Sequence, residues 1–518
     1  MTWLTRFNPI PAFPSYTGPY KVGSTDVEIP TTDLADPSVS PTNSVPTIAF
    51  RIFYPCQPDS AQQSVRWIPS PQREYIGAYA RFLGASSAFS HVFSVLPQLL
   101  YYISIPVCHD AQILEPPTHS KKWPVMIFSH GLGGSRNAYS HLLGSLSSHG
   151  IVVIAPDHRD GSSPLSFVCD VEGKDKTKKV EYRKVAHKAS TEVYESRDDQ
   201  LRTRLWELGL IHDAILKIDG GVKIKNTANT RSNKHDSRDI LAMFSHLLDV
   251  QSGSIAFAGH SFGAATMVQF VKSVFYYSDS QPLDYKPLFT LSKSSSLISQ
   301  ITPSSPVILL DLWTLPIQSP ATAWLKDKSM PCYTSSNGGA SLLAILSEAF
   351  YKWSSNLRET KRVVAKPPES SNKFPGQPGP HIYYPVASAH LSQSDFGVLF
   401  PWITTKIFGA KEPERVLKLN VRAILQVLRD SNLEVADTCI ADLELDEDHA
   451  KTDLATSQPQ DWKILSSAKD TVRGWVSLTT DPDPSDEQSK PVAAPSDAVI
   501  EGEVLGEVVH EPERSSRI

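Results

Sequence analysis

A five-residue pattern between two apolar segments restricts the fold of this chain more than any other feature. Residues 259–263 read Gly-His-Ser-Phe-Gly, with the apolar run SIAFA before them and the small and apolar residues AATMVQFV after them. This order predicts a buried strand, a sharp turn and a helix. The turn lifts the hydroxyl of Ser261 above the sheet, and the two glycines let strand and helix approach without Cβ clashes. The pattern predicts that Ser261 is a nucleophile; the alternative is a turn serine without a catalytic role.

The rest of the chain alternates between short apolar runs and segments with helical spacing. Continuous apolar runs of this length are typical of parallel strands that are buried on both faces. We predict strands at 47–54, 124–129, 151–155, 254–258, 307–310 and 382–387, and helices at 139–149, 197–218, 240–248 and 413–433. The alternation predicts an α/β protein with a mostly parallel central sheet flanked by helices.

Some segments do not fit this alternation. Four of them are rich in Ser, Pro, Lys or Asn, and we expect long insertions there: 161–196, 220–238, 278–306 and 326–380. From residue 440 onward the chain has 18 Asp and Glu against 7 Lys and Arg. We expect a folded domain at 13–436 and an acidic, largely disordered C-terminal tail at 440–518.

The cysteines and the N-terminus indicate the compartment. The five cysteines are scattered and none forms a CxxC pair, which favours a reducing compartment over a disulfide framework or a zinc site. The first residues contain no apolar signal segment. The longest apolar stretch, 93–107, is shorter than the roughly 20 residues that span a bilayer. We expect a cytoplasmic protein, and the weak charge balance gives no support for nucleic-acid binding.

A glycine-rich segment after an earlier strand predicts an oxyanion hole. Residues 128–134 read FSHGLGG, similar to the loop that donates one backbone N–H to the tetrahedral intermediate of acyl transfer. We predict that the N–H of Leu132 and the N–H of Phe262, the residue after Ser261, form the pair of donors. Dinucleotide binding is the competing interpretation, but Arg136 stands where the third glycine of that motif is needed.

A nucleophilic serine needs a base, and the base needs an orienting acid. When a serine of this kind begins a helix after a strand, the acid and then the histidine follow on loops after later strands. Asp311 ends the apolar run VILLD, and His390 follows the run IYYPVASA. We therefore predict Asp311 as the acid and His390 as the base. The competing candidates fit less well by position: His260, His381, Asp279, Asp284 and Asp395.

Two charged segments have simpler interpretations. Residues 157–160 read Asp-His-Arg-Asp, which resembles a metal site, but no HExxH motif or further histidine stands nearby. We expect hydrogen bonds and ion pairs that fix a loop beside the active site. The basic run 174–188 is expected to be a solvated loop, with an anionic membrane surface as the alternative.

Several longer segments, spread from residue 13 into the 430s, match the pattern of one known family. These segments are FPSYTGPYKVGSTDVEI, RIFYPCQ, VMIFSHGLGGSRNAYS, SHGIVVIAPDHRDGS, ILKIDGG, IAFAGHSFGAAT, LLDLWTLP and the segment from His390 to the Asp-Phe pair. Together they resemble the plasma and intracellular single-chain branch of the platelet-activating factor acetylhydrolases, a calcium-independent phospholipase family of the α/β-hydrolase fold. The family's triad falls on Ser261, Asp311 and His390, and its oxyanion donors fall on Leu132 and Phe262.

The resemblance implies hydrolysis of the sn-2 acetyl or short-chain ester of platelet-activating factor-like phospholipids, with no metal or organic cofactor. It also implies peripheral contact with a membrane surface, for which apolar residues at 89–102 are candidates; the alternative is that this stretch belongs to the core. Two other functions remain open. One is a general carboxylesterase or lipase, and the other is a catalytically inactive binding protein of the same fold.

Overall fold

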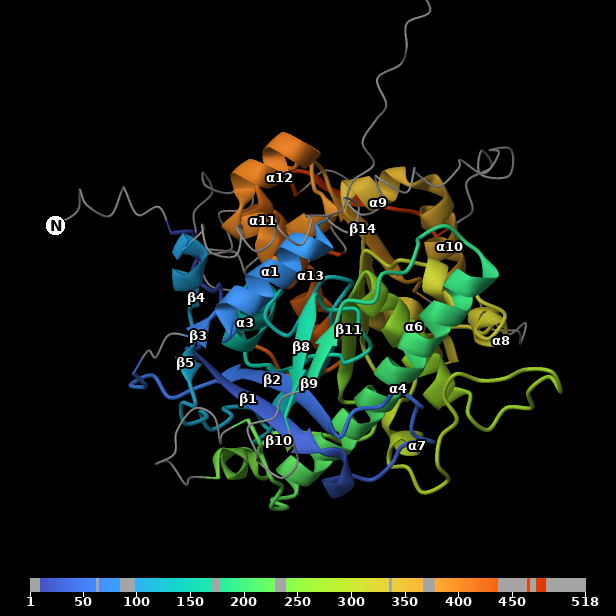
Figure 1. The fold of residues 1–518 in the computed structure, drawn as a ribbon, viewed down its shortest axis with the longest axis horizontal. Helices are drawn as coiled ribbons and strands as arrows, with labels where there is room; N and C mark the ends of the chain where they lie inside the picture. The colour runs from blue at the N-terminus through green and yellow to red at the C-terminus, as the bar shows by residue number, and fades with distance from the viewer. Residues whose placement is uncertain are drawn as a thin grey trace, which may run out of the picture.

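A computed structural model describes residues 10–61, 65–83, 98–169, 178–228, 239–334, 338–366, 378–436, 464–465 and 472–480. Its central sheet has the strand order β15-β14-β13-β12-β11-β6-β7-β2-β1-β5, with β10 pairing β6 (Figure 1). The strands are β1 (Val22–Pro30), β2 (Thr47–Pro55), β5 (Cys108–His109), β6 (Trp123–Ser129), β7 (Val152–Pro156), β10 (Leu248–Asp249), β11 (Ala256–His260), β12 (Val307–Leu310), β13 (Leu342–Ile345), β14 (His381–Pro385) and β15 (Trp475–Ser477).

The middle of this sheet is parallel, as the sequence predicts. The strands from β14 through β13, β12, β11 and β6 to β7 pair in parallel. Antiparallel pairing begins at β2 on one side and at β15 on the other. Parallel strands end at one edge of the sheet, so the residues that follow β6, β11, β12 and β14 lie near one another. This edge carries the candidate site.

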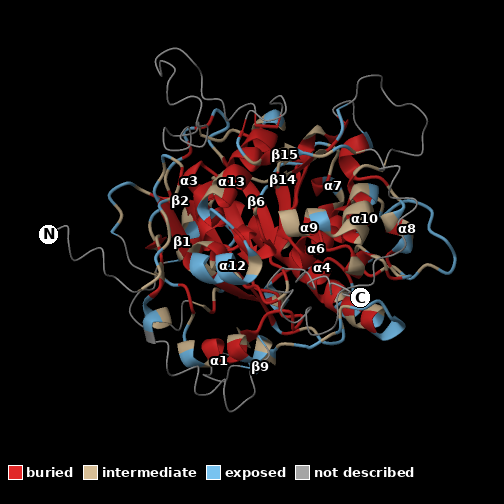
Figure 2. Ribbon diagram, turned by 90° about the horizontal axis from the view of Figure 1, so that it is seen from above, coloured by how far each residue is buried: buried red, intermediate tan, exposed pale blue. Residues whose placement is uncertain are grey.

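Helices cover both faces of the sheet. The longer ones are α1 (Gln72–Phe82), α3 (Ser140–Ser148), α4 (Thr191–Asp219), α6 (Phe262–Phe275), α10 (Ser354–Val364) and α13 (Pro413–Asp430). Alternate residues of each strand face opposite ways, which divides the core into two clusters. Val125 and Ile127 pack with α4 and α6, whereas Met126 and Phe128 pack with α3 and α13. Figure 2 shows the sheet and the helices α3, α4, α6 and α13 as mostly buried, whereas α1 and α10 are more exposed.

Shorter elements complete the described chain. The strands are β3 (Val65–Arg66), β4 (Ser104–Ile105), β8 (Leu165–Val168) and β9 (Lys178–Glu181). The helices are α7 (Leu297–Gln300), α8 (Ala323–Lys326), α9 (Glu348–Lys352), α11 (Asp395–Leu399) and α12 (Pro401–Phe408). The 3₁₀ turns are Thr31–Asp33, Gln98–Tyr102, Ile240–Phe244, Leu315–Ile317, Pro331–Thr334, Gly338–Ser341 and His390–Gln393. Within the described residues, no helix is long and apolar enough to cross a bilayer.

All six predicted strands are present, within one or two residues of their predicted ends, but five further strands of the sheet were not predicted: β1, β5, β10, β13 and β15. The segment 326–380, predicted as an insertion, contains β13, α9 and α10. The run Leu342–Ile345 is only four residues long and stands among serines and glycines, so the sequence gives little signal for it. The helix predicted at 240–248 is a 3₁₀ turn followed by β10.

The C-terminal region contributes to the fold beyond the boundary that the sequence suggests. β15 pairs antiparallel with β14, and the ring of Trp475 stacks on Tyr383 at 5.1 Å. Ile464 and Leu465 are buried in the core, and the hydroxyl of Tyr383 donates to the carbonyl of Leu465. The folded unit therefore includes parts of 440–518. The rest of that segment lies outside the described residues.

Candidate active site

Ser261 lies on the predicted strand–turn–helix junction, between β11 and α6. Its backbone has φ 56° and ψ −117°, a region that is unfavourable for a residue with a side chain. The neighbourhood holds it there: its N–H donates to the carbonyl of Leu310 at 2.8 Å. A Cβ at Gly263 would lie 2.0 Å from the carbonyl oxygen of Ser129, and one at Gly259 would lie 2.4 Å from the carbonyl oxygen of Gly263. Both glycines are required for the close approach of strand and helix.

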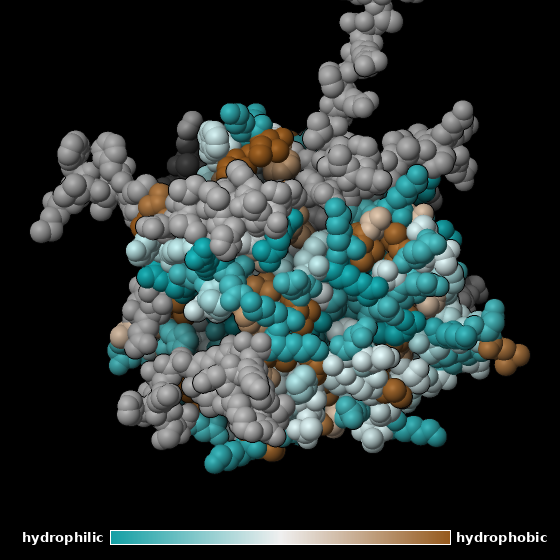
Figure 3. All heavy atoms as spheres, in the orientation of Figure 1, coloured by the Kyte–Doolittle hydropathy of each residue, from teal (hydrophilic) through white to brown (hydrophobic). Residues whose placement is uncertain are grey.

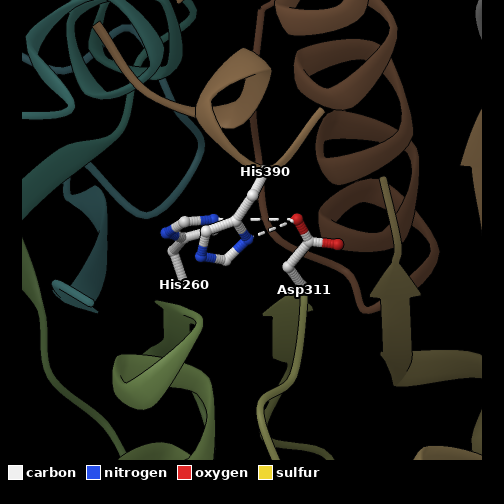
Figure 4. Close-up of side chains that lie close together, drawn as sticks. All are labelled: His260, Asp311 and His390. Carbon is white, nitrogen blue, oxygen red and sulfur yellow. Dashed lines mark hydrogen bonds and ion pairs between the residues drawn. The ribbon is translucent and has the colours of Figure 1, made fainter. Parts of the chain in front are cut away.

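Asp311 follows β12, the strand next to β11. It is fully buried, and its φ is also positive, at 44°. One carboxylate oxygen, Oδ1, accepts from the N–H of Ser347, and the other, Oδ2, accepts from Nδ1 of His390 at 2.8 Å (Figure 4). Burial alone would raise the pKa of Asp311, but the neighbouring His260 and the hydrogen-bonded His390 lower it to about 2. The acid is therefore a carboxylate at neutral pH.

His390 begins the 3₁₀ turn after β14, as its predicted role requires. Its ring stacks on Phe350 at 4.6 Å with an interplanar angle of 6°. Because Nδ1 is bonded to Asp311, Nε2 is the nitrogen that remains for proton transfer with Ser261. No hydrogen bond joins Ser261 Oγ to His390 among the described residues, so that contact stays a prediction. Such bonds are often long before substrate binds.

His260 is a second histidine beside the same carboxylate, which the sequence interpretation did not anticipate. Its Nε2 lies 3.9 Å from Asp311 Oδ2, and its ring centre lies 4.2 Å from that of His390. Burial and the neighbouring His390 lower the pKa of His260 to about 4. The three side chains could in principle hold a metal ion. The direct bond between His390 and Asp311 joins two of the three ligand atoms, which is the arrangement of a proton-transfer pair.

The other candidates for base and acid lie elsewhere. His381 is the first residue of β14, at the opposite end of that strand from His390. Asp395 accepts from the N–H groups of Ser140 and His141 at the start of α3, and burial raises its pKa to about 7. Asp279 pairs with Lys328. Asp284 is exposed on a loop.

The predicted oxyanion loop packs directly against the nucleophile. A Cβ at Gly131 would lie 3.0 Å from the Cβ of Ser261. The carbonyl of Gly131 accepts from Nδ1 of His130 at 2.8 Å and from the N–H of Gly134 at 3.2 Å. Within the described chain, neither the N–H of Leu132 nor that of Phe262 donates to a protein acceptor. Their role as oxyanion donors stays a prediction.

A buried arginine supports both predicted donors. Arg204 of α4 donates from Nη1 to the carbonyl of His130 at 2.8 Å, and its guanidinium lies 4.3 Å from the ring centre of Phe262. Its charge is paired with Asp160, whose Oδ2 accepts from Nε at 2.7 Å. Arg204 is fully buried. One side chain thus fixes the peptide that leads into the oxyanion loop and the residue after the nucleophile.

We predict that Arg204→Lys lowers kcat by about tenfold to a hundredfold, because one ammonium cannot replace a guanidinium that bonds several partners at once. The conserved charge keeps Asp160 paired, so the protein should still fold. Arg202→Lys is the matched control, since Arg202 lies on the same helix, has a side chain that is 41% exposed and pairs with Asp199. Steady-state kinetics and thermal melting of both variants provide the test. Equal kcat values in the two variants would contradict the prediction.

The Asp157–Asp160 segment has the structural role expected from the sequence. His158 bonds through Nδ1 to Glu207 at 2.7 Å and through Nε2 to Ser129 Oγ at 2.9 Å. Burial raises the pKa of Glu207 to about 8. These contacts connect the end of β7 to the end of β6 and to α4. The expectation of a hydrogen-bonded loop beside the site is confirmed.

An apolar cavity opens at the site. It has a volume of about 230 Å³, and Leu132, His260 and His390 are among its lining residues. Apolar side chains of α1 and α12, such as Phe82 and Ile407, form another part of its wall. Around α12 the surface is hydrophobic, as the brown patch at the top of Figure 3 shows. The cavity therefore leads from the candidate triad to an apolar part of the surface.

The fold and the order of these residues define a protein of the α/β-hydrolase class. A mostly parallel sheet carries a serine on a strand–helix turn, and an acid and a histidine follow later strands in that order. Comparison with family models then makes the assignment specific. The chain belongs to the family of platelet-activating factor acetylhydrolase, isoform II, whose model matches residues 6–446.

Relatives have names consistent with this family. A putative phospholipase A2 of Schizosaccharomyces pombe is 26% identical over 446 residues, covering 81% of this chain and 92% of that protein. Platelet-activating factor acetylhydrolases of Gallus gallus and Canis lupus familiaris are 30% and 28% identical. These two matches cover 49% of this chain, and 56% and 51% of those proteins, so they span about half the length of each.

One solved structure is more distant. A ferulic acid esterase from Streptomyces cinnamoneus aligns with 81% of this chain and 93% of its own, at 13% identity and a TM-score of 0.45. This likeness is too weak to support an argument about function.

Proposed function

We propose that this protein is a serine esterase that hydrolyses the sn-2 acetyl or short-chain ester of platelet-activating factor-like phospholipids. The observation that carries the proposal is the bond between His390 and Asp311 at the sheet edge where Ser261 begins its helix. Membership of the family and the names of the relatives support the phospholipid substrate.

The mechanism is a two-step acyl transfer. Nε2 of His390 takes the proton of Ser261, and Oγ attacks the ester carbonyl carbon. The N–H groups of Leu132 and Phe262 stabilise the oxyanion, and the glycerol oxygen leaves with the proton from His390. A water molecule, activated by the same imidazole, then attacks the acyl-enzyme and releases the carboxylic acid. Each step uses groups of this chain and water, so we expect turnover to be independent of calcium.

The competing function within enzymes is a general carboxylesterase or lipase. The test compares purified protein on phosphatidylcholines with sn-2 chains of graded length, on a triglyceride and on a p-nitrophenyl ester, each with and without a calcium chelator. We expect the highest kcat/KM on the acetyl and short-chain phospholipids, unchanged by the chelator. Faster turnover of the triglyceride would favour the lipase. Failure of a fluorophosphonate to label Ser261 would favour an inactive binding protein.

The surface at the cavity mouth supports binding to a phospholipid surface. On α12, Trp402 is 71% exposed and Ile407 is 60% exposed, and Leu83 at the end of α1 is 49% exposed. Within the stretch 89–102 that the resemblance suggested, Leu99 and Tyr102 are also exposed; Phe89, Val92, Phe93 and Leu96 lie outside the described residues. Exposed apolar side chains beside a lipid-binding cavity are typical of proteins that lie on a membrane without crossing it.

We predict that Trp402→Ser weakens binding to phosphatidylcholine vesicles by about tenfold, because it removes a large apolar side chain from the contact. Trp402 does not line the cavity, so hydrolysis of a water-soluble ester should be unchanged. Leu283→Ser is the control, because Leu283 is exposed on the loop before α7. Vesicle sedimentation measures both variants. Equal loss of binding in the control would argue against a specific surface at α12.

A further inference from the structure

A chain of polar contacts runs from the oxyanion loop toward the carboxylate of Asp311. The hydroxyl of Tyr139, at the start of α3, accepts from the N–H of Gly131 at 3.1 Å. The same hydroxyl lies 2.8 Å from Nδ1 of His260. Among the described residues, no other acceptor lies within hydrogen-bond distance of this hydroxyl, so we assign its proton to the bond with Nδ1 of His260. All three groups are buried.

These contacts determine which nitrogen of His260 carries the proton. Since Nδ1 accepts from Tyr139, a neutral His260 has its proton on Nε2. Nε2 lies 3.9 Å from Asp311 Oδ2, which is too far for a hydrogen bond, and it has no hydrogen-bond partner within the described part of the chain. The pKa of His260, lowered to about 4 by burial and by His390, keeps the ring neutral at physiological pH. A fixed N–H dipole therefore faces the acid.

We propose that Tyr139 and His260 form a positioning pair that couples the oxyanion loop to the Asp311–His390 pair. The inference rests on the proposed function, because both ends of this connection belong to the proposed acyl-transfer machinery. Neither side chain takes part in bond making. Tyr139 acts through Gly131, and His260 acts through Asp311.

Hydrogen bonds to the peptide before Gly131 fix the shape of the oxyanion loop. The peptide between His130 and Gly131 is held on both sides, since Arg204 donates to its carbonyl at 2.8 Å and its N–H donates to Tyr139. The next peptide carries the N–H of Leu132, and its carbonyl is also bonded. Removing the hydroxyl of Tyr139 removes one of the two hydrogen bonds that hold the peptide between His130 and Gly131. It also leaves the buried N–H of Gly131 without an acceptor.

Contacts on both carboxylate oxygens fix the orientation of Asp311. Oδ1 accepts from Ser347 and Oδ2 accepts from His390. The N–H of His260 approaches Oδ2 from β11, whereas His390 approaches it from the turn after β14. An amide at position 260 could supply both an acceptor for Tyr139 and a donor for Asp311, but an aliphatic side chain could supply neither.

The first test is Tyr139→Phe, which deletes a single oxygen atom. We expect kcat on the acetyl phospholipid to fall by about tenfold to a hundredfold, somewhat less than the roughly 10²–10³-fold for removing an oxyanion donor itself. KM should stay within about twofold, because the hydroxyl is not expected to contact the substrate. Tyr54→Phe is the matched control, since its buried hydroxyl donates to the carbonyl of Ala111 at 2.7 Å, away from the site. It should melt at a similarly lowered temperature with unchanged kcat.

The second test compares two substitutions at position 260. His260→Gln should retain kcat to within about threefold of the wild-type enzyme, and His260→Leu should resemble Tyr139→Phe, because only the amide restores both contacts. The inference is overturned if Tyr139→Phe keeps the wild-type kcat, if Tyr54→Phe loses as much kcat as Tyr139→Phe, or if Leu and Gln at position 260 give the same kcat. The proposed function would instead be refuted if the wild-type protein showed no esterase turnover and a fluorophosphonate did not label it.

Discussion

Ser261→Ala is expected to lower kcat on the preferred ester by about 10⁶-fold, because every step of the proposed mechanism passes through the Ser261 oxygen. Folding should be unaffected. Alanine keeps the Cβ, the backbone of residue 261 keeps its bond to Leu310, and the side chain loses only one oxygen atom. Purified variant and wild-type protein are compared by single-turnover kinetics and by thermal melting.

The control for this prediction is Ser273→Ala. Ser273 lies on α6 as well, and it is buried near the other end of that helix. It should turn over the ester at the wild-type rate. A Ser261→Ala sample that retains turnover near the wild-type level, and is free of contaminating esterase, would show that another residue is the nucleophile.

The two histidines at Asp311 give the second large expected effect. His390→Gln should lower kcat by about 10⁶-fold, because it removes the base that accepts the proton of the serine. His260→Gln should change kcat only a few-fold, because His260 has its Nδ1 bonded to Tyr139 and its pKa lowered to about 4.

Measuring kcat of both variants under identical conditions shows which of the two histidines is the base. The two residues are matched in burial, with 5% and 3% of their surfaces exposed, so a difference in stability should not obscure the result. A larger loss of kcat in His260→Gln than in His390→Gln would show that His260, and not His390, is the base.

The sequence predicts the strand–turn–helix at Ser261 because its determinants are local. An apolar run, two glycines and a helix with small residues occupy about twenty consecutive positions, and each limits the backbone independently. Asp311 and His390 are identifiable for a related reason. Chain order and the ends of apolar runs are visible in a sequence, and the structure does bring these two side chains into contact.

The contacts that support the site are not visible in the same way. Arg204 lies within a helix whose apolar spacing is clear, but its burial depends on Asp160 and on the carbonyl of His130, far away in the chain. Tyr139 is the first residue of the predicted helix 139–149, and the sequence gives no signal of its bond to His260. β13 and β15 are too short to be recognised, since each is completed by its neighbour in the sheet and not by its own pattern.

The positive φ angle of Ser261 places a cost in stability at the residue that the reaction needs. Backbone in this region costs on the order of 1–3 kcal/mol per residue, and only glycine avoids the cost. Glycine at position 261 would therefore make the domain harder to melt while removing the nucleophilic oxygen. A search for thermostable variants that does not also measure turnover would favour this substitution, and would select inactive protein.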